Sequence, residues 1–196
     1  FNNKTLANLK VRKALLMAID REGLVNNVLN GYGTAAKTLV PKGIGIKGLN
    51  DKDFTEGVPT STLAYNPQEA KKLLEEGLKE TGAAKFPNMS MLINESGNNK
   101  VIAEYIQEQL RKNLGIELNL EIMTAQERFS RMKQKNFDLV LAGWYGDYPD
   151  AITYLDLFES TGGTNYGSYK NPQYDALVKT VRTAVNSLGT SMTVLV

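Results

Sequence analysis

Hydrophobic residues recur along much of the chain at the spacing of one helical face. Asn8, Asp20 and Asn66 stand directly before three of these amphipathic segments, where N-cap residues are expected. Gly82 and Gly115 directly follow two others, at the position where a helix commonly ends in a left-handed glycine. The pattern therefore predicts helices over residues 9–19, 21–29, 67–81, 101–114, 125–134, 152–158 and 172–181.

Three shorter segments have the apolar content and alternation of strands, over residues 89–94, 116–122 and 137–141. Between residues 89 and 143 these strands alternate with helices, an order that implies right-handed crossovers and parallel pairing. We therefore predict an α/β fold in which a mixed, largely parallel sheet is flanked by helices.

Residues 32–65 follow neither period and predict a long surface loop. Within it, Gly43–Gly48 matches the pattern G-x-G-x-x-G, but no strand precedes it and no helix start follows, so a flexible loop is favoured over a dinucleotide site. The acidic run Asp51–Glu56 lacks the remaining ligands of a calcium loop and predicts a solvated turn. No cofactor and no metal site are expected.

The composition excludes several classes of catalytic and metal-binding site. The 196 residues contain no His and no Cys, which excludes His-dependent nucleophilic triads, thiolate zinc sites and disulfides. A net charge of +2 argues against a nucleic-acid binder, and no apolar stretch is long enough for a transmembrane segment. The chain starts with neither an initiator Met nor a signal peptide, so we expect it to be a processed product or an excised fragment.

Aromatic residues concentrate late in the chain, where eight of the sixteen lie between Trp144 and Tyr174. Tyr154 and Phe158 fall on a predicted helix and are expected in the core. Trp144, Tyr145 and Tyr148 instead follow the last predicted strand. Ligands of open parallel sheets bind at the carboxyl ends of strands, so this loop is the candidate site.

The same window is acidic, which suits a cationic ligand. Residues 144–170 contain four carboxylates and a single base, Lys170. An ammonium group is expected to contact Asp147 beside the face of Trp144. Alternatively, Asp147 and Asp150 form the acid/base pair of a hydrolase, but no independent second carboxylate motif completes such a site.

Three motifs, in this order, carry a family resemblance. They are residues 11–25 (VRKALLMAIDREGLV), Phe137-Asp138-Leu139 leading into Gly143-Trp144-Tyr145-Gly146-Asp147-Tyr148-Pro149-Asp150, and Asn171-Pro172-Gln173-Tyr174-Asp175. Together they resemble the carboxy-terminal lobe of the oligopeptide/dipeptide-binding proteins of ABC importers, solute-binding protein family 5. The resemblance covers about residues 1–185, whereas the uncharged tail 186–196 departs from the family pattern.

The resemblance implies one lobe of a type II periplasmic-binding-protein-like fold and a non-catalytic protein that captures oligopeptides in a two-lobe cleft. Asp147 would meet the peptide α-ammonium, and the other ligand-binding residues would be Trp144, Tyr145, Gly146 and Tyr148. The implied partners are the peptide, the missing N-terminal lobe and the importer's permease subunits.

The implied location is extracytoplasmic, periplasmic or at the cell surface through a lipid anchor outside this fragment. Enteric members place an Arg just before the Gly-Trp motif, where Leu141 and Ala142 stand here. A related protein for a non-peptide solute, such as a nickel complex, a sugar or haem, remains the alternative within the family.

Overall fold

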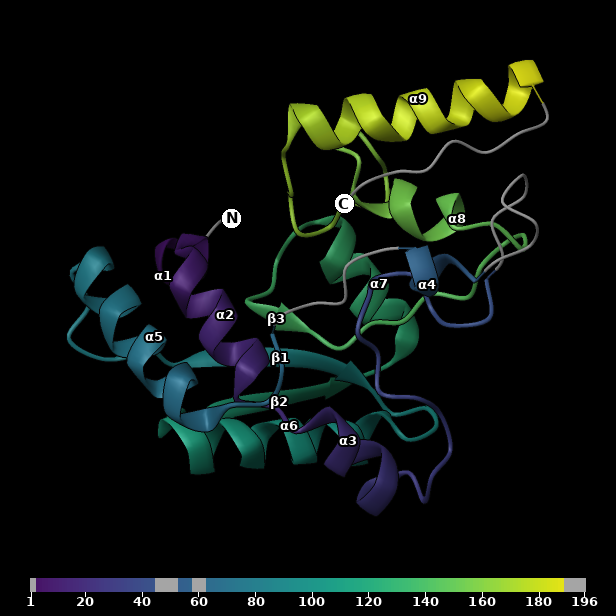
Figure 1. Ribbon diagram of the computed structural model, residues 1–196. Coiled ribbons are helices and arrows are strands. Elements are labelled where there is room, and N and C mark those ends of the chain that lie inside the picture. Colours follow the sequence, from purple (N-terminus) through teal and green to yellow (C-terminus); the bar gives the residue numbers. More distant parts are fainter. Residues whose placement is uncertain (1–2, 45–52, 58–62, 189–196) are drawn as a thin grey trace. The chain divides into compact units, whose positions relative to one another are not determined.

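The computed structural model describes residues 3–44, 53–57 and 63–188 (Figure 1). The chain forms two compact units, and each is described by itself. The first unit comprises Phe1–Ala35 and Thr62–Ala142, and the second comprises Ala36–Ser61 and Gly143–Val196. That residues 1–185 form one lobe of a larger protein stays a prediction.

The first unit contains a parallel sheet in the strand order β2-β1-β3. β1 (Met89–Asn94) pairs along its whole length with β2 (Leu118–Met123) and over two residues with β3 (Leu139–Val140). The connecting helices α6 (Asn99–Leu114) and α7 (Ala125–Lys133) lie on opposite faces of the sheet (Figure 1). The predicted α/β class, with a parallel sheet flanked by helices, is confirmed.

The remaining helices of this unit are α1 (Lys4–Ala7), α2 (Leu9–Met17), α3 (Arg21–Gly23), the π-helical turn Leu24–Val28 and α5 (Pro67–Thr81). Asn8 and Asn66 cap α2 and α5 as predicted, since the Asn8 side-chain oxygen accepts two backbone N–H groups of the first turn and that of Asn66 accepts one. Gly82 and Gly115 adopt the left-handed conformation after α5 and α6. These boundaries depend on local signals, which explains why the sequence pattern located them.

The hydrophobic core of the first unit joins β1 to α2, α5 and α6. Met89, Met91 and Ile93 alternate along β1 toward this core, together with Val11 of α2 and Leu74 of α5. α2 and α5 approach closely at Gly77, where an added Cβ would lie 2.7 Å from Val11 Cγ2. A larger residue at position 77 would therefore separate the two helices.

Two predicted elements of this unit differ from the observed ones. The helix expected over 21–29 is one α-helical turn followed by a π-helical turn. The last strand is shorter than the predicted 137–141, although the Leu141 N–H still donates to the Leu92 carbonyl of β1 at 2.9 Å. Asp138 accepts the N–H of Ser90 at 3.1 Å, and Arg128 donates to the Leu141 carbonyl at 2.6 Å.

The second unit is built from short helices and loops. Its elements are α4 (Phe54–Gly57), α8 (Ile152–Leu155), the 3-10 turn Asp156–Phe158 and α9 (Pro172–Leu188). Their core consists of Val40, Phe54, Ala151, Leu155 and Val178. α4 lies inside the predicted loop 32–65. Residues of this loop therefore share one small core with α8 and α9, which are far from it in sequence.

Most of the Gly43–Gly48 pattern, Asp51 of the acidic run and residues 189–196 of the tail lie outside the described residues. Asp53 is described, and its carboxylate accepts the Thr55 N–H at 2.8 Å and the Gly43 N–H. These bonds hold the start of α4 and lower the pKa of Asp53, with the Thr55 hydroxyl as the largest cause. Over residues 53–57 this segment is a capped helical turn.

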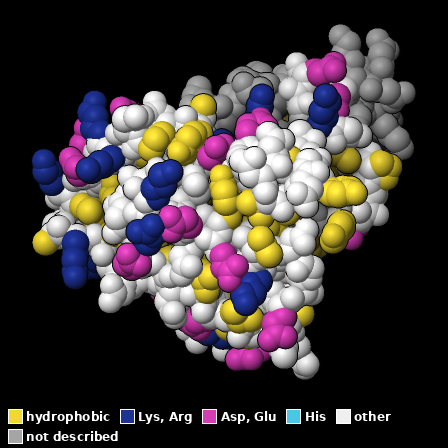
Figure 2. All heavy atoms as spheres, turned by 90° about the horizontal axis from the view of Figure 1, so that it is seen from below, with side chains coloured by type: hydrophobic (Ala, Val, Ile, Leu, Met, Phe, Trp, Pro, Cys, Tyr) yellow, Lys and Arg dark blue, Asp and Glu magenta, His cyan; other side chains and the backbone are white. Residues whose placement is uncertain are grey.

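Charged side chains of both signs are interspersed on the face displayed in Figure 2. Within the described ranges, no helix combines the length and the apolar character needed to span a bilayer.

Candidate ligand-binding site

The loop that follows β3 presents the predicted site residues at the surface of the second unit. Every residue from Gly143 to Pro149 is exposed. Trp144 and Tyr148 are 42% and 46% exposed, whereas Tyr145 is 94% exposed. The first two thus have one side packed and one side wet, as aromatic residues of ligand sites commonly do.

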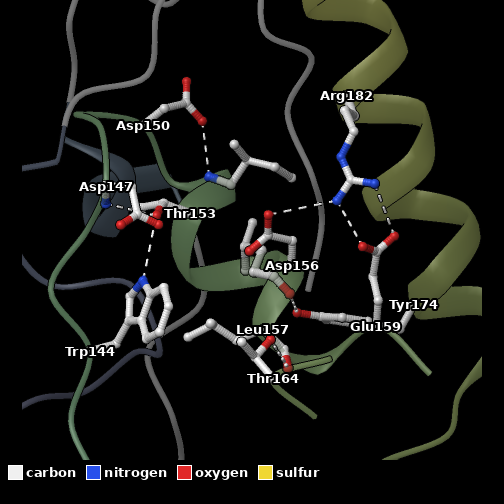
Figure 3. Close-up of polar contacts among 12 residues, drawn as sticks. Trp144, Asp147, Asp150, Thr153, Asp156, Leu157, Glu159, Thr164, Tyr174 and Arg182 are labelled. Carbon is white, nitrogen blue, oxygen red and sulfur yellow. Dashed lines mark hydrogen bonds and ion pairs between the residues drawn. The ribbon is translucent and has the colours of Figure 1, made fainter. Parts of the chain in front are cut away.

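Thr153 in α8 organises the turn from Trp144 to Asp147 (Figure 3). Its Oγ1 accepts the Asp147 backbone N–H at 3.1 Å and, at a long 3.5 Å, the Trp144 indole N–H. Gly146 lies between them and passes close to α8, since an added Cβ would lie 3.0 Å from Thr153 Cγ2 and 2.9 Å from Tyr154 Oη. A residue larger than glycine at position 146 would require the turn, Thr153 or the Tyr154 side chain to shift.

The two carboxylates of the loop have different surroundings. Asp150 Oδ1 accepts the Ile152 N–H at 2.9 Å, so this side chain holds the start of α8. The Asp147 carboxylate is exposed and makes no hydrogen bond or ion pair with any residue that the structure describes. It is therefore available to an external cation and is not buried against a Lys or Arg.

Arg182 of α9 adds a base that the sequence window 144–170 did not contain. Its Nη2 lies 2.7 Å from Glu159 Oε2 and 3.7 Å from Asp156 Oδ2 (Figure 3). Two of the four carboxylates counted in that window are thus paired. Because Asp150 holds α8, the negative charge that remains without a partner among the described residues is that of Asp147.

Burial and neighbouring charges shift two ionisable groups beside the loop. Burial, followed by Glu159 and Asp147, raises the pKa of Asp156, and Arg182 opposes this shift. Burial also raises the pKa of Tyr148, to which Asp156 and Asp150 contribute further. Tyr148 therefore stays a neutral phenol at neutral pH, with its ring beside an acidic surface.

Tyr174 fixes the core beneath this loop. Its hydroxyl donates to the Leu155 carbonyl, and its ring meets Tyr169 edge to face with 5.6 Å between ring centroids. Burial raises the pKa of Tyr174 to about 12. Tyr154 packs against the same core as expected, whereas the expectation for Phe158 is wrong because this last residue of the 3-10 turn is 37% exposed.

The structure brings three of the five predicted residues together. Trp144, Gly146 and Asp147 meet around Thr153, and Tyr148 lies on the same exposed loop. Tyr145 makes no hydrogen bond or ring contact with the described part of the chain. Thr153 itself was missed by the sequence reasoning, because a single threonine within a helix gives no pattern that marks it.

Comparison with known proteins identifies the family of this chain. The sequence pattern of the bacterial extracellular solute-binding proteins, family 5 middle region, matches residues 1–166. The dipeptide-binding protein of Lactococcus lactis subsp. cremoris is 33% identical over 186 residues, covering 94% of this chain and 33% of that protein. Bacillus subtilis OppA, an oligopeptide-binding protein, is 32% identical over 184 residues, covering 92% of this chain and 32% of its own length.

Solved structures agree with these relatives. The substrate-binding domain of an oligopeptide ABC transporter from Bacillus anthracis matches with a TM-score of 0.86 and 31% identity, over 94% of this chain and 35% of that one. Listeria monocytogenes OppA bound to peptide matches with a TM-score of 0.83 and 33% identity, over 89% of this chain and 34% of that one. This chain therefore spans about a third of the length of its relatives.

Proposed function

Because this chain belongs to family 5 of the bacterial extracellular solute-binding proteins, we propose that it is part of the peptide-binding component of an ABC importer. The names of its relatives support a peptide ligand, since they include dipeptide- and oligopeptide-binding proteins. The Listeria relative was solved with a peptide bound. The family consists of non-catalytic binding proteins, and the hydrogen bond from the Ile152 N–H to Asp150 argues against the Asp147/Asp150 hydrolase alternative.

Asp147 contacts the α-ammonium of the peptide. The observation that carries this role is the exposed carboxylate without a partner among the described residues, on the turn that also presents the Trp144 indole. A carboxylate and an aromatic face together form a surface for an ammonium group. Tyr145, Gly146 and Tyr148 line the same end of the ligand site.

The intact protein works outside the cytoplasm. There it closes a second lobe over the peptide and delivers the peptide to the permease subunits of the importer. The periplasmic relatives from Salmonella typhimurium and Escherichia coli support this location. An ion pair in a closed, desolvated site contributes several kcal/mol, whereas an exposed pair contributes roughly 0–1 kcal/mol. This chain alone should therefore bind peptides weakly.

The ligand class is tested by purifying the intact protein, denaturing it and recording mass spectra of the small molecules that it releases. We expect short peptides that are absent from protein denatured, washed and refolded without ligand. Release of a sugar, a metal chelate or haem, with no peptide, would contradict the proposal and favour the non-peptide alternative.

A further inference from the structure

We propose that Thr153 is the positioning residue that gives this site its selectivity for a free amino terminus. The inference rests on the proposed function, since it assigns a role at the site where Asp147 meets the ammonium. Thr153 touches no ligand in this proposal. It acts through the two groups that it holds, the Asp147 backbone and the Trp144 indole.

The geometry of the hydroxyl supports this role. A threonine oxygen has two lone pairs, and two N–H groups that are separate in sequence point at this oxygen (Figure 3). The bonds run from opposite ends of a four-residue turn to one atom. They therefore fix the indole and the aspartate relative to each other.

The acceptor is itself held rigidly. Thr153 is only 2% exposed and stands in α8, whose first residue, Ile152, donates its N–H to the Asp150 carboxylate. Its helix neighbours Ala151 and Leu155 belong to the core of the second unit. The exposed turn is thus tied to a helix of the core through a buried hydroxyl.

Loss of that hydroxyl has a specific consequence. The Asp147 N–H and the indole N–H would turn to water, and the turn would no longer hold its carboxylate beside the ring. The negative charge of Asp147 would remain, but the position of its carboxylate relative to the Trp144 ring would no longer be fixed. Ammonium selectivity should therefore fall, whereas contacts to the rest of a peptide should be retained.

The test uses the intact protein and a pool of random-sequence pentapeptides, made once with free amino termini and once N-acetylated. Selectivity is the ratio of the two apparent dissociation constants. T153V, which keeps the shape but removes the hydroxyl, should lower selectivity about threefold to tenfold, the range that corresponds to one hydrogen bond. T153S should restore most of it, and T153A repeats the measurement if T153V does not fold.

A matched control and a second readout separate positioning from general destabilisation. T164V removes a hydroxyl of the same unit that bonds the Leu157 carbonyl, and it should leave selectivity unchanged. Hydrogen exchange of the segment containing Asp147 should become faster in T153V and should stay near the wild-type rate in T153S and T164V.

The outcomes distinguish the two proposals. If D147N abolishes selectivity and T153V preserves it, the role of Thr153 is wrong and the ammonium contact stands. If T153V and T153S lose selectivity equally, the hydroxyl is not the cause and the inference also fails. If D147N leaves selectivity at the wild-type value, the ammonium contact itself is wrong and the inference falls with it.

Discussion

Arg182 on α9 forms an ion pair with Glu159, with 2.7 Å between Nη2 and Oε2. The same guanidinium lies 3.7 Å from Asp156. The pairing ties α9 to the segment that follows α8, and it neutralises two carboxylates near the candidate ligand site. The pairing does not involve the Asp147 carboxylate.

Removal of this base should make stability depend more strongly on pH. The folded-state pKa of Asp156 is already raised above the ordinary value of 3.8, mainly by burial, so the stability that its protonation provides is lost as pH rises through that pKa. Arg182 opposes the shift. R182Q should therefore cost about 0.2–1 kcal/mol of unfolding free energy near neutral pH, the range of an exposed pair, and less below about pH 3.8.

Urea unfolding of wild type and R182Q at neutral pH and below about pH 3.8 measures this difference in unfolding free energy. K170Q removes one positive charge from an exposed position of the same unit and should change stability little at either pH. An equal loss for R182Q at both pH values would show that its effect does not come from the carboxylates.

The contact between α2 and α5 predicts an unusual effect of a glycine substitution. Ala normally stabilises a helix relative to Gly by about 0.5–1 kcal/mol. In G77A, however, the new Cβ would lie 2.7 Å from Val11 Cγ2 and 3.0 Å from the Val11 backbone nitrogen. Overpacking of this kind costs about 1–3 kcal/mol, so we expect a net loss of stability and a lower Tm.

The matched control is G163A, because a Cβ at position 163 would meet no described atom within 4 Å and this residue does not have a left-handed φ. Its thermal unfolding midpoint should stay close to that of the wild type. A G77A protein as stable as wild type would mean that α2 and α5 can separate at little cost.

Lys10 predicts a pH effect in the first unit. Its Nζ lies 2.7 Å from Glu76 and 2.8 Å from Glu80, and hydrogen bonds to Lys10 lower the pKa of both carboxyls. Groups whose folded pKa is lowered stabilise the fold above their unfolded pKa, 4.5 here, and this stability is lost as pH falls through the folded pKa. K10M should raise both pKa values toward 4.5, as carbon-detected NMR titration would show.

K100M is the control, since the Lys100–Glu104 pair is longer, at 3.8 Å, and lies elsewhere on the unit. It should leave the titration of Glu76 and Glu80 unchanged. Unaltered titration of these two groups in K10M would contradict the pairing.

The sequence pattern predicted the elements that depend on local signals. Asn66 before α5 and Gly115 after α6 are examples, because capping involves residues only a few positions apart. The length of β3 was overestimated, and the contact of the Arg128 side chain with the Leu141 carbonyl, thirteen residues away, was not foreseen. Tertiary contacts of this kind leave no periodic trace in the sequence.

The residues of the candidate site also divide into those that the sequence predicted and those that it did not. Trp144 and Asp147 were found from their position after the last strand and from the family resemblance. Thr153 and Arg182 were not found, because their roles depend on where α8 and α9 lie against the loop. The sequence window 144–170 therefore did not show that Arg182 pairs with two of its carboxylates.

The most direct test of the ammonium contact is a thermodynamic cycle on the intact protein. Binding of the free and N-acetylated pentapeptide pools is compared for wild type, D147N and D150N, where the last variant removes a charge but keeps an oxygen that can accept the Ile152 N–H. D147N should weaken binding of free peptides by about 2–5 kcal/mol and that of acetylated peptides much less, with little change in D150N. Equal weakening of both pools by D147N, or none, would contradict the assignment of Asp147 to the peptide ammonium.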